Sequence, residues 1–147
     1  MTRARKDRRH RAREAALQIL YQWEIGRTDV DRATEMFFAQ QWPEVDPPAD
    51  ALRGFASDLA RDTVSRLDTI DPVIAETAER WRPERMAVLD RLILRMAVCE
   101  LVRDADTPRA VVINEALELA RTFSTEESVK FINGMLDAIR KKLDVRR

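Results

Sequence analysis

The chain has 147 residues, of which 45% are apolar, and its 26 Lys or Arg balance its 26 Asp or Glu to a formal net charge of zero. This length suits one domain with its own core, while three glycines and a single cysteine, Cys99, argue against a loop-rich β fold and exclude a disulfide framework. No apolar run approaches the roughly 18 residues that a membrane helix needs, and no secretory leader is readable, so we expect a cytoplasmic protein.

The charges are distributed unevenly along the chain. Residues 1–13 contain seven Lys or Arg and one Asp, and a second basic cluster lies within residues 140–147. Such segregation favours a polyanionic partner. The alternative is a solvated basic arm without a role. We expect residues 1–8 to be a flexible arm of a single helical domain that spans residues 1–147.

The apolar pattern predicts helices throughout, because no segment alternates strictly between apolar and polar residues. The first predicted helix runs from Asp7 to Ile25 and ends at Gly26, and the second covers residues 31–41. The next segment, residues 42–48, contains three prolines and is predicted to be a loop. A third helix is predicted over residues 49–67.

Three later helices are predicted to begin at capping signals. Asp71-Pro72 and Thr107-Pro108 each place a capping side chain before a proline, which is favoured at the first helical position. Ser124 begins a capping box. Together with a helix over residues 83–103, these signals predict an all-α chain of about seven helices.

The predicted helix over residues 83–103 is apolar on nearly every side. Such a helix is normally surrounded by other helices or covered by a partner. We expect it to be the central helix of the fold. The alternative is that one side, around Leu94, Val98 and Cys99, contacts another protein.

No group of residues in the sequence suggests catalysis. His10 and Cys99 are the only His and Cys, so no metal site is predicted. The glycines are too far apart for a phosphate-binding loop, and Cys99, in the middle of a helix, is expected to be a packing residue. We therefore expect a non-enzymatic protein without a cofactor.

The first helix combines a core stripe with an outward-facing aromatic residue. At about 100° per residue, one face carries the apolar stripe and Tyr21 lies on the opposite side. The stripe consists of Ala12, Ala16, Ile19, Leu20 and Trp23. An exposed ring downstream of an arginine cluster suits nucleic-acid binding. The alternative is an ordinary exposed tyrosine.

The last helix repeats this arrangement. Lys130 faces away from its apolar stripe, and Phe131 lies off the stripe to the same side. The stripe consists of Val129, Ile132, Leu136, Ile139 and Leu143. A cation that holds phosphate beside a ring that stacks on bases predicts binding of single-stranded nucleic acid. The alternative for Phe131 is packing in a secondary hydrophobic cluster.

Three segments resemble the NusB family of bacterial transcription antitermination factors. They are "RRHRAREAALQILYQWE", "AVLDRLILRMAVCEL" and "AVVINEALELARTFSTEESVKFINGMLDAI". The resemblance extends from about Arg8 to Leu143, and the motifs at residues 113–116 and 131–134 are specific when taken together. It implies an all-helical RNA-binding domain of two small packed bundles.

The resemblance also implies a function. Members of this family bind the boxA element of nut-site RNA, notably in ribosomal RNA operons, and bind it better with the small-subunit ribosomal protein NusE. With NusA and NusG, they assemble on RNA polymerase a complex that resists termination. The alternative for this chain is a helical protein–protein adaptor with only generic RNA affinity.

The family's functional residues carry over by motif. The implied RNA-binding residues are Arg8, Arg9, Arg11, Arg13, Tyr21, Glu127, Ser128, Lys130 and Phe131. The implied partner-binding residues are Arg95, Cys99 and Glu100. Cys99 departs from the aromatic residue that many members have at this position.

Overall fold

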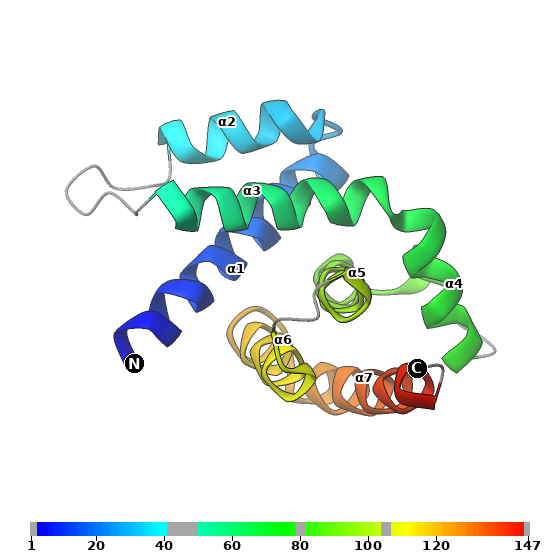
Figure 1. Cartoon of the computed structure of the whole chain (residues 1–147). Helices are drawn as coiled ribbons and strands as arrows, with labels where there is room; N and C mark the ends of the chain where they lie inside the picture. The colour runs from blue at the N-terminus through cyan, green and yellow to red at the C-terminus, as the bar shows by residue number, and fades with distance from the viewer. Residues whose placement is uncertain (1–2, 41–49, 79–81, 104–106, 146–147) are drawn as a thin grey trace. The chain divides into compact units, whose positions relative to one another are not determined.

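The computed structural model describes residues 3–40, 50–78, 82–103 and 107–145, without the side chains of residues 3–8 and 83. The predicted proline-rich loop at residues 42–48 therefore lies outside the described residues. The described residues form seven α-helices and one short 3-10 helix, without a β-strand, which confirms the all-α prediction (Figure 1). None of these helices is long and apolar enough to cross a membrane.

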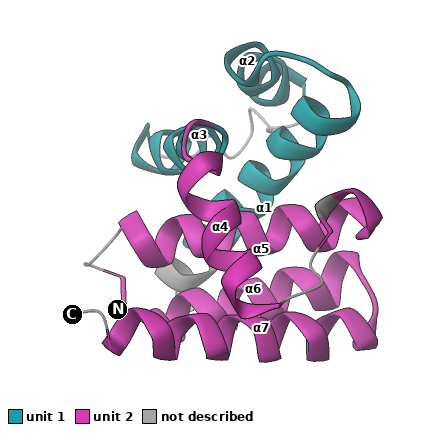
Figure 2. Ribbon diagram, turned by 90° about the vertical axis from the view of Figure 1, so that its right-hand side faces the viewer, with its two compact units in different colours: residues 1–64 teal, residues 65–147 magenta. Residues whose placement is uncertain are grey.

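The chain forms two compact units, residues 1–64 and residues 65–147, which agrees with the predicted pair of helical bundles (Figure 2). The first unit consists of α1 (Arg3–Ile25), α2 (Val30–Gln40) and α3 (Asp50–Ser65), which ends at the boundary. The second unit consists of α4 (Leu67–Thr77), the 3-10 helix η1 (Pro83–Arg85), α5 (Val88–Arg103), α6 (Arg109–Phe123) and α7 (Glu126–Val145). Because α1 begins at Arg3 and not at Asp7, it includes most of the predicted arm, whose flexibility stays a prediction.

The core of the first unit joins α1 to α3 through small side chains. Ala12 and Ala15 of α1 and Ala56 of α3 are fully buried, and partly buried aromatic and leucine side chains pack around them. These surrounding residues are Phe37, Phe38, Leu52 and Phe55. Alanines on α1 allow the bulkier rings of α2 and α3 to fill the space beside it, which is how a core reaches close packing.

Gly26 ends α1 as predicted, and its backbone explains why glycine is needed there. The Gly26 N–H donates to the carbonyl oxygen of Gln22 at 2.9 Å. A Cβ atom at Gly26 would lie 2.6 Å from that same oxygen, closer than real contacts allow. Arg27, which follows, has a φ of 51° and turns the chain toward α2.

Helix α5 is the central element of the second unit. Every residue from Asp90 to Leu101 is buried, and α4, α6 and α7 all pack against α5 (Figure 2). This confirms the prediction of a central helix. Replacing a core residue such as Leu92, which is fully buried, with Ala would cost about 2–5 kcal/mol of stability.

The predicted helix start at Asp71-Pro72 is wrong, because Pro72 lies inside α4. Ile70 and Ile74, one turn apart, are both fully buried. Arg95 of α5 donates to both carboxylate oxygens of Asp71, at 3.0 and 2.9 Å. The helix interior normally disfavours proline by about 3 kcal/mol, and these tertiary contacts offset that cost.

The helix predicted from residue 83 is interrupted before α5 begins. The 3-10 turn ends at Arg85, and α5 starts only at Val88. The carbonyl oxygen of Met86 accepts from the guanidinium of Arg91 at 3.4 Å, where a continuous helix would supply a backbone N–H. At the break between η1 and α5, the side chain of Arg91 thus takes the place of a backbone N–H as the donor to Met86.

The caps of α6 and α7 are each displaced by one residue from the prediction. Pro108, and not Thr107, is the N-cap of α6. Thr125, and not Ser124, caps α7, because its Oγ1 accepts from the N–H of Ser128 at 3.1 Å. The predicted capping box fails because α7 begins one residue later than expected, at Glu126, and the hydroxyl of Ser124 donates to a carboxylate of α5.

Candidate nucleic-acid interface

Helix α1 presents Tyr21 to solvent, as its sequence predicts. The side chain is 43% exposed. On the opposite face, Trp23 of the predicted stripe is partly buried, and the other four stripe residues are completely buried. These four are Ala12, Ala16, Ile19 and Leu20. On the face shared with Tyr21, His10 Nε2 lies 3.0 Å from Glu14 Oε1. Tyr21 is therefore an exposed aromatic residue on the side of α1 opposite its buried stripe.

The four arginines implied as phosphate contacts are not equivalent in the structure. Arg11 is exposed and Arg9 is partly buried, whereas Arg13 is only 2% exposed. The side chain of Arg8 lies outside the described residues. Of these four arginines, the described part of the first unit thus exposes Arg11 most and Arg9 in part.

Arg13 differs from its sequence interpretation because it stacks on a ring of α3. The guanidinium carbons of Arg9 and Arg13 lie 4.6 and 5.1 Å from the ring centroid of Phe55. The two arginines are four residues apart and so share one face of α1, which brings both to the same ring. A buried cation over an aromatic face contributes to stability, and it leaves Arg13 turned away from a phosphate in solvent.

Helix α7 presents the second predicted pair of residues. Lys130 is exposed and Phe131 is 42% exposed. Ile132, Leu136 and Ile139 of the predicted stripe are completely buried, so the helix has the predicted orientation within its unit. A cation and an exposed aromatic residue are adjacent on this helix, a combination that suits the binding of single-stranded nucleic acid.

Glu127 and Ser128, also implied by the family, have different surroundings. Glu127 is exposed. The hydroxyl of Ser128 donates to Oδ2 of Asp90 at 2.6 Å, and that of Ser124 donates to Oδ1 of Asp90 at 2.6 Å. Sequence reasoning missed Asp90. The only local signal was an acidic residue within an apolar helix, at a position that the structure buries.

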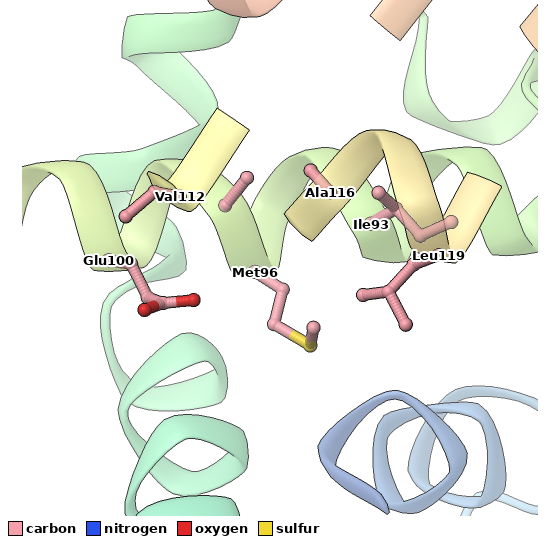
Figure 3. Close-up of a pocket in the computed structure, with 7 residues that line it drawn as sticks. Ile93, Met96, Glu100, Val112, Ala116 and Leu119 are labelled. Atoms are coloured by element: carbon pink, nitrogen blue, oxygen red, sulfur yellow. The ribbon is translucent and has the colours of Figure 1, made fainter. Parts of the chain in front are cut away.

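The residues implied as partner contacts are all buried. Arg95 is 8% exposed and pairs with Asp71, Glu100 is 2% exposed, and Cys99 is fully buried. Glu100 lines a small pocket between α5 and α6, together with Met96 and other apolar side chains (Figure 3). Its volume of about 10 Å³ is the size of a single water. None of the three presents a contact surface in this structure, and their role in partner binding stays a prediction.

The basic cluster near the C terminus is partly neutralised by acidic neighbours. Arg140 Nη2 donates to Asp137 Oδ1 at 2.8 Å, and Lys141 Nζ lies 3.2 Å from Oδ2. The hydrogen bond from Arg140, followed by that from Lys141, lowers the pKa of Asp137 below its ordinary value of 3.8. Asp137 in turn raises the pKa of Arg140. These cations are therefore less available to RNA than Lys130.

Comparison with known proteins shows which family the chain is similar to. The model of the NusB family matches residues 10–141. A curated relative, the transcription antitermination protein NusB of Koribacter versatilis, is 45% identical over 139 residues, which cover 95% of this chain and 92% of the relative. The chain belongs to the NusB family. Its function is that of the family, transcription antitermination, and because these are non-enzymatic factors, the prediction that it is not an enzyme is confirmed.

Solved structures of NusB proteins share the fold. NusB of T. maritima superposes with a TM-score of 0.80 at 34% identity and covers 91% of each chain. A crystal structure of the antitermination factors NusB and NusE in complex with dsRNA gives a TM-score of 0.79 at 24% identity, covering 97% of this chain and 99% of that one. The all-helical architecture is therefore that of NusB structures. Among the described residues, no group of three or more His, Cys, Asp or Glu could hold a metal ion.

Proposed function

We propose that this NusB-family chain binds single-stranded boxA RNA together with the ribosomal protein NusE. In the cytoplasm, this complex would then join NusA and NusG on RNA polymerase. The observation that carries the proposal is that two helices, α1 and α7, each present a solvent-exposed ring, Tyr21 and Phe131, with an exposed cation, Arg11 or Lys130, on the same helix.

The two kinds of side chain have separate tasks in this proposal. The cations of Arg11 and Lys130 neutralise phosphates, which supplies affinity that depends on salt and little on sequence. The rings of Tyr21 and Phe131 stack on unpaired bases, which a duplex does not offer. A strand with splayed bases is therefore the ligand that uses both features.

Three observations support the proposal. Most of the described acidic residues on α2 and α3 are exposed, among them Glu35 and Asp50, and would repel a long duplex. The family is one of antitermination proteins. A NusB of the same fold has been crystallised with NusE and dsRNA, which supports the NusE and RNA parts of the proposal; the preference for a single strand rests on the exposed rings.

The alternative, a protein adaptor with generic RNA affinity, required contacts through the helix at residues 83–103. Within its own unit that helix is enclosed by α4, α6 and α7, so the structure offers this alternative less support than the sequence did. It remains an outcome of the experiment below.

The proposal is tested by fluorescence anisotropy with a labelled single-stranded boxA RNA. A scrambled strand and the same boxA strand annealed into a duplex serve as controls, each measured with and without NusE. We expect tighter binding to single-stranded boxA than to either control, and a further gain with NusE. Equal weak binding to all three RNAs, unchanged by NusE, would favour the adaptor.

A further inference from the structure

One buried carboxylate joins three helices of the second unit. Asp90, in the first turn of α5, is 9% exposed. Its Oδ1 accepts a hydrogen bond from Ser124 Oγ and its Oδ2 accepts one from Ser128 Oγ, both at 2.6 Å. Short hydrogen bonds to an ionised oxygen are about twice as strong as neutral ones. Each oxygen of Asp90 thus holds one hydroxyl.

The hydroxyl of Ser128 is fully engaged in this network. It donates its proton to Asp90 and accepts a hydrogen bond from Thr125 Oγ1 at 3.1 Å. The N–H of Ser128 donates to the same Thr125 oxygen. In this arrangement Ser128 has no hydroxyl proton to offer to an RNA phosphate, although it lies two residues before Lys130.

The positions of the two serines determine what the carboxylate holds. Ser124 directly follows α6, and Ser128 lies in the first turn of α7. Asp90 therefore fixes the turn between α6 and α7 against the start of α5. A helix turns about 100° per residue, so holding Ser128 against α5 also sets the directions in which Lys130 and Phe131 project.

We propose that Asp90 is a positioning residue for RNA binding, which acts through Ser124 and Ser128 to fix the first turn of α7. This inference rests on the proposed function, because it assigns to Asp90 the orientation of Lys130 and Phe131. Ser128 then contributes to RNA binding through Asp90 and not through a contact of its own. Losing the network leaves the first turn of α7 to be ordered when RNA binds.

The test compares Asp90→Ala with the control Asp144→Ala. Asp144 is also an aspartate that ties α6 to α7, since it pairs with Arg109 and Arg140, but it lies near the far end of α7. Both substitutions remove one negative charge, which alone would strengthen RNA binding. We expect Asp90→Ala to weaken boxA RNA binding by about two- to tenfold, because this is the cost of ordering about one side chain on binding. We expect Asp144→Ala to leave RNA binding unchanged or slightly tighter.

Folding is checked by circular dichroism, and hydrogen exchange should be faster at the first-turn amides of α7 in Asp90→Ala alone. If Asp90→Ala does not fold, Ser128→Ala and Ser128→Thr test the positioning role in its place, because only Thr keeps the hydroxyl that binds Asp90. We expect loss of affinity in Ser128→Ala and its recovery in Ser128→Thr. Where both singles fold, adding Ser128→Ala to Asp90→Ala should cost nothing further, since the two act as one unit.

Two outcomes would overturn the inference, and they are distinguishable from failure of the proposed function. A folded Asp90→Ala that binds RNA as tightly as the wild type, or more tightly, removes the positioning role. So does a Ser128→Thr variant as weak as Ser128→Ala. In both cases Phe131→Ala still binds weakly. If Phe131→Ala binds like the wild type, the proposed function fails on this helix, and the inference fails with it.

Discussion

The guanidinium of Arg13 lies over the ring of Phe55, with its central carbon 5.1 Å from the ring centroid, and joins α1 to α3. The guanidinium carbon of Arg9 lies 4.6 Å from the centroid of the same ring. An arginine that the sequence places in a phosphate-binding cluster is thus part of the packing of its own unit. The basic segment of α1 contains two kinds of arginine, one that packs and one that remains in solvent.

This division predicts different effects for two neighbouring substitutions. Arg13→Ala should lower the free energy of unfolding by about 2 kcal/mol, because a desolvated cation–π contact and the packing of the side-chain stem are lost. Arg11→Ala, at an exposed position, should change it by less than about 0.5 kcal/mol. Urea denaturation of the two variants measures the difference. Equal stabilities would contradict the structural role of Arg13.

The salt dependence of RNA binding separates the same two arginines. If three to five phosphates are neutralised, log K should fall with log[salt] at a slope of about −2 to −3.5 for a single strand. Arg11→Ala should reduce the magnitude of this slope by about 0.7, the value of one phosphate contact. Arg13→Ala should leave the slope unchanged. An affinity that does not vary with salt would rule out the electrostatic part of the account.

The exposed rings are expected to contribute to RNA binding and not to stability. Tyr21→Ala and Phe131→Ala should each weaken RNA binding by about 1–3 kcal/mol, the value of one base stack. Ile25 of α1 and Val111 of α6 are matched controls, because they are exposed by 52% and 42% without an aromatic ring. Their Ala variants should bind RNA normally. A large loss of thermal stability in Tyr21→Ala or Phe131→Ala would instead assign that ring to the core.

The ion pairs of Asp137 with Arg140 and Lys141 predict an effect of pH on stability. Because the pKa of Asp137 is lowered in the folded state, its contribution to stability is complete above the ordinary value of 3.8 and is lost as pH falls through the lowered pKa. Asp137→Asn should therefore have a lower melting temperature than the wild type at neutral pH. The difference should vanish in acid. A difference that persists there would point to packing and not to charge.

The sequence predicts those features that depend on one helix at a time. The stripes of α1 and α7 follow from a period of 3.6 residues, so the exposure of Tyr21, Lys130 and Phe131 could be predicted from spacing alone. The end of α1 at Gly26 could likewise be predicted from the local sequence. In both helices, the face that packs can be identified from the helix's own sequence pattern.

The features that the sequence did not predict depend on contacts between helices distant along the chain. Pro72 is tolerated inside α4 because buried neighbours hold that helix, as does an arginine that pairs with Asp71 from 24 residues away. Arg13 is withdrawn from solvent by a ring of α3. Asp90 selects Ser124 and Ser128 as partners from 34 and 38 residues away. No periodicity within one segment carries this information.

The central claim, that the exposed rings of α1 and α7 each contact single-stranded RNA, is tested most directly by photo-cross-linking. A boxA RNA with 5-iodouridine at successive positions is bound to the protein with NusE, irradiated, and the cross-linked peptides are identified by mass spectrometry. The account predicts cross-links to both Tyr21 and Phe131. Cross-links confined to other residues, or to one of the two helices only, would contradict it.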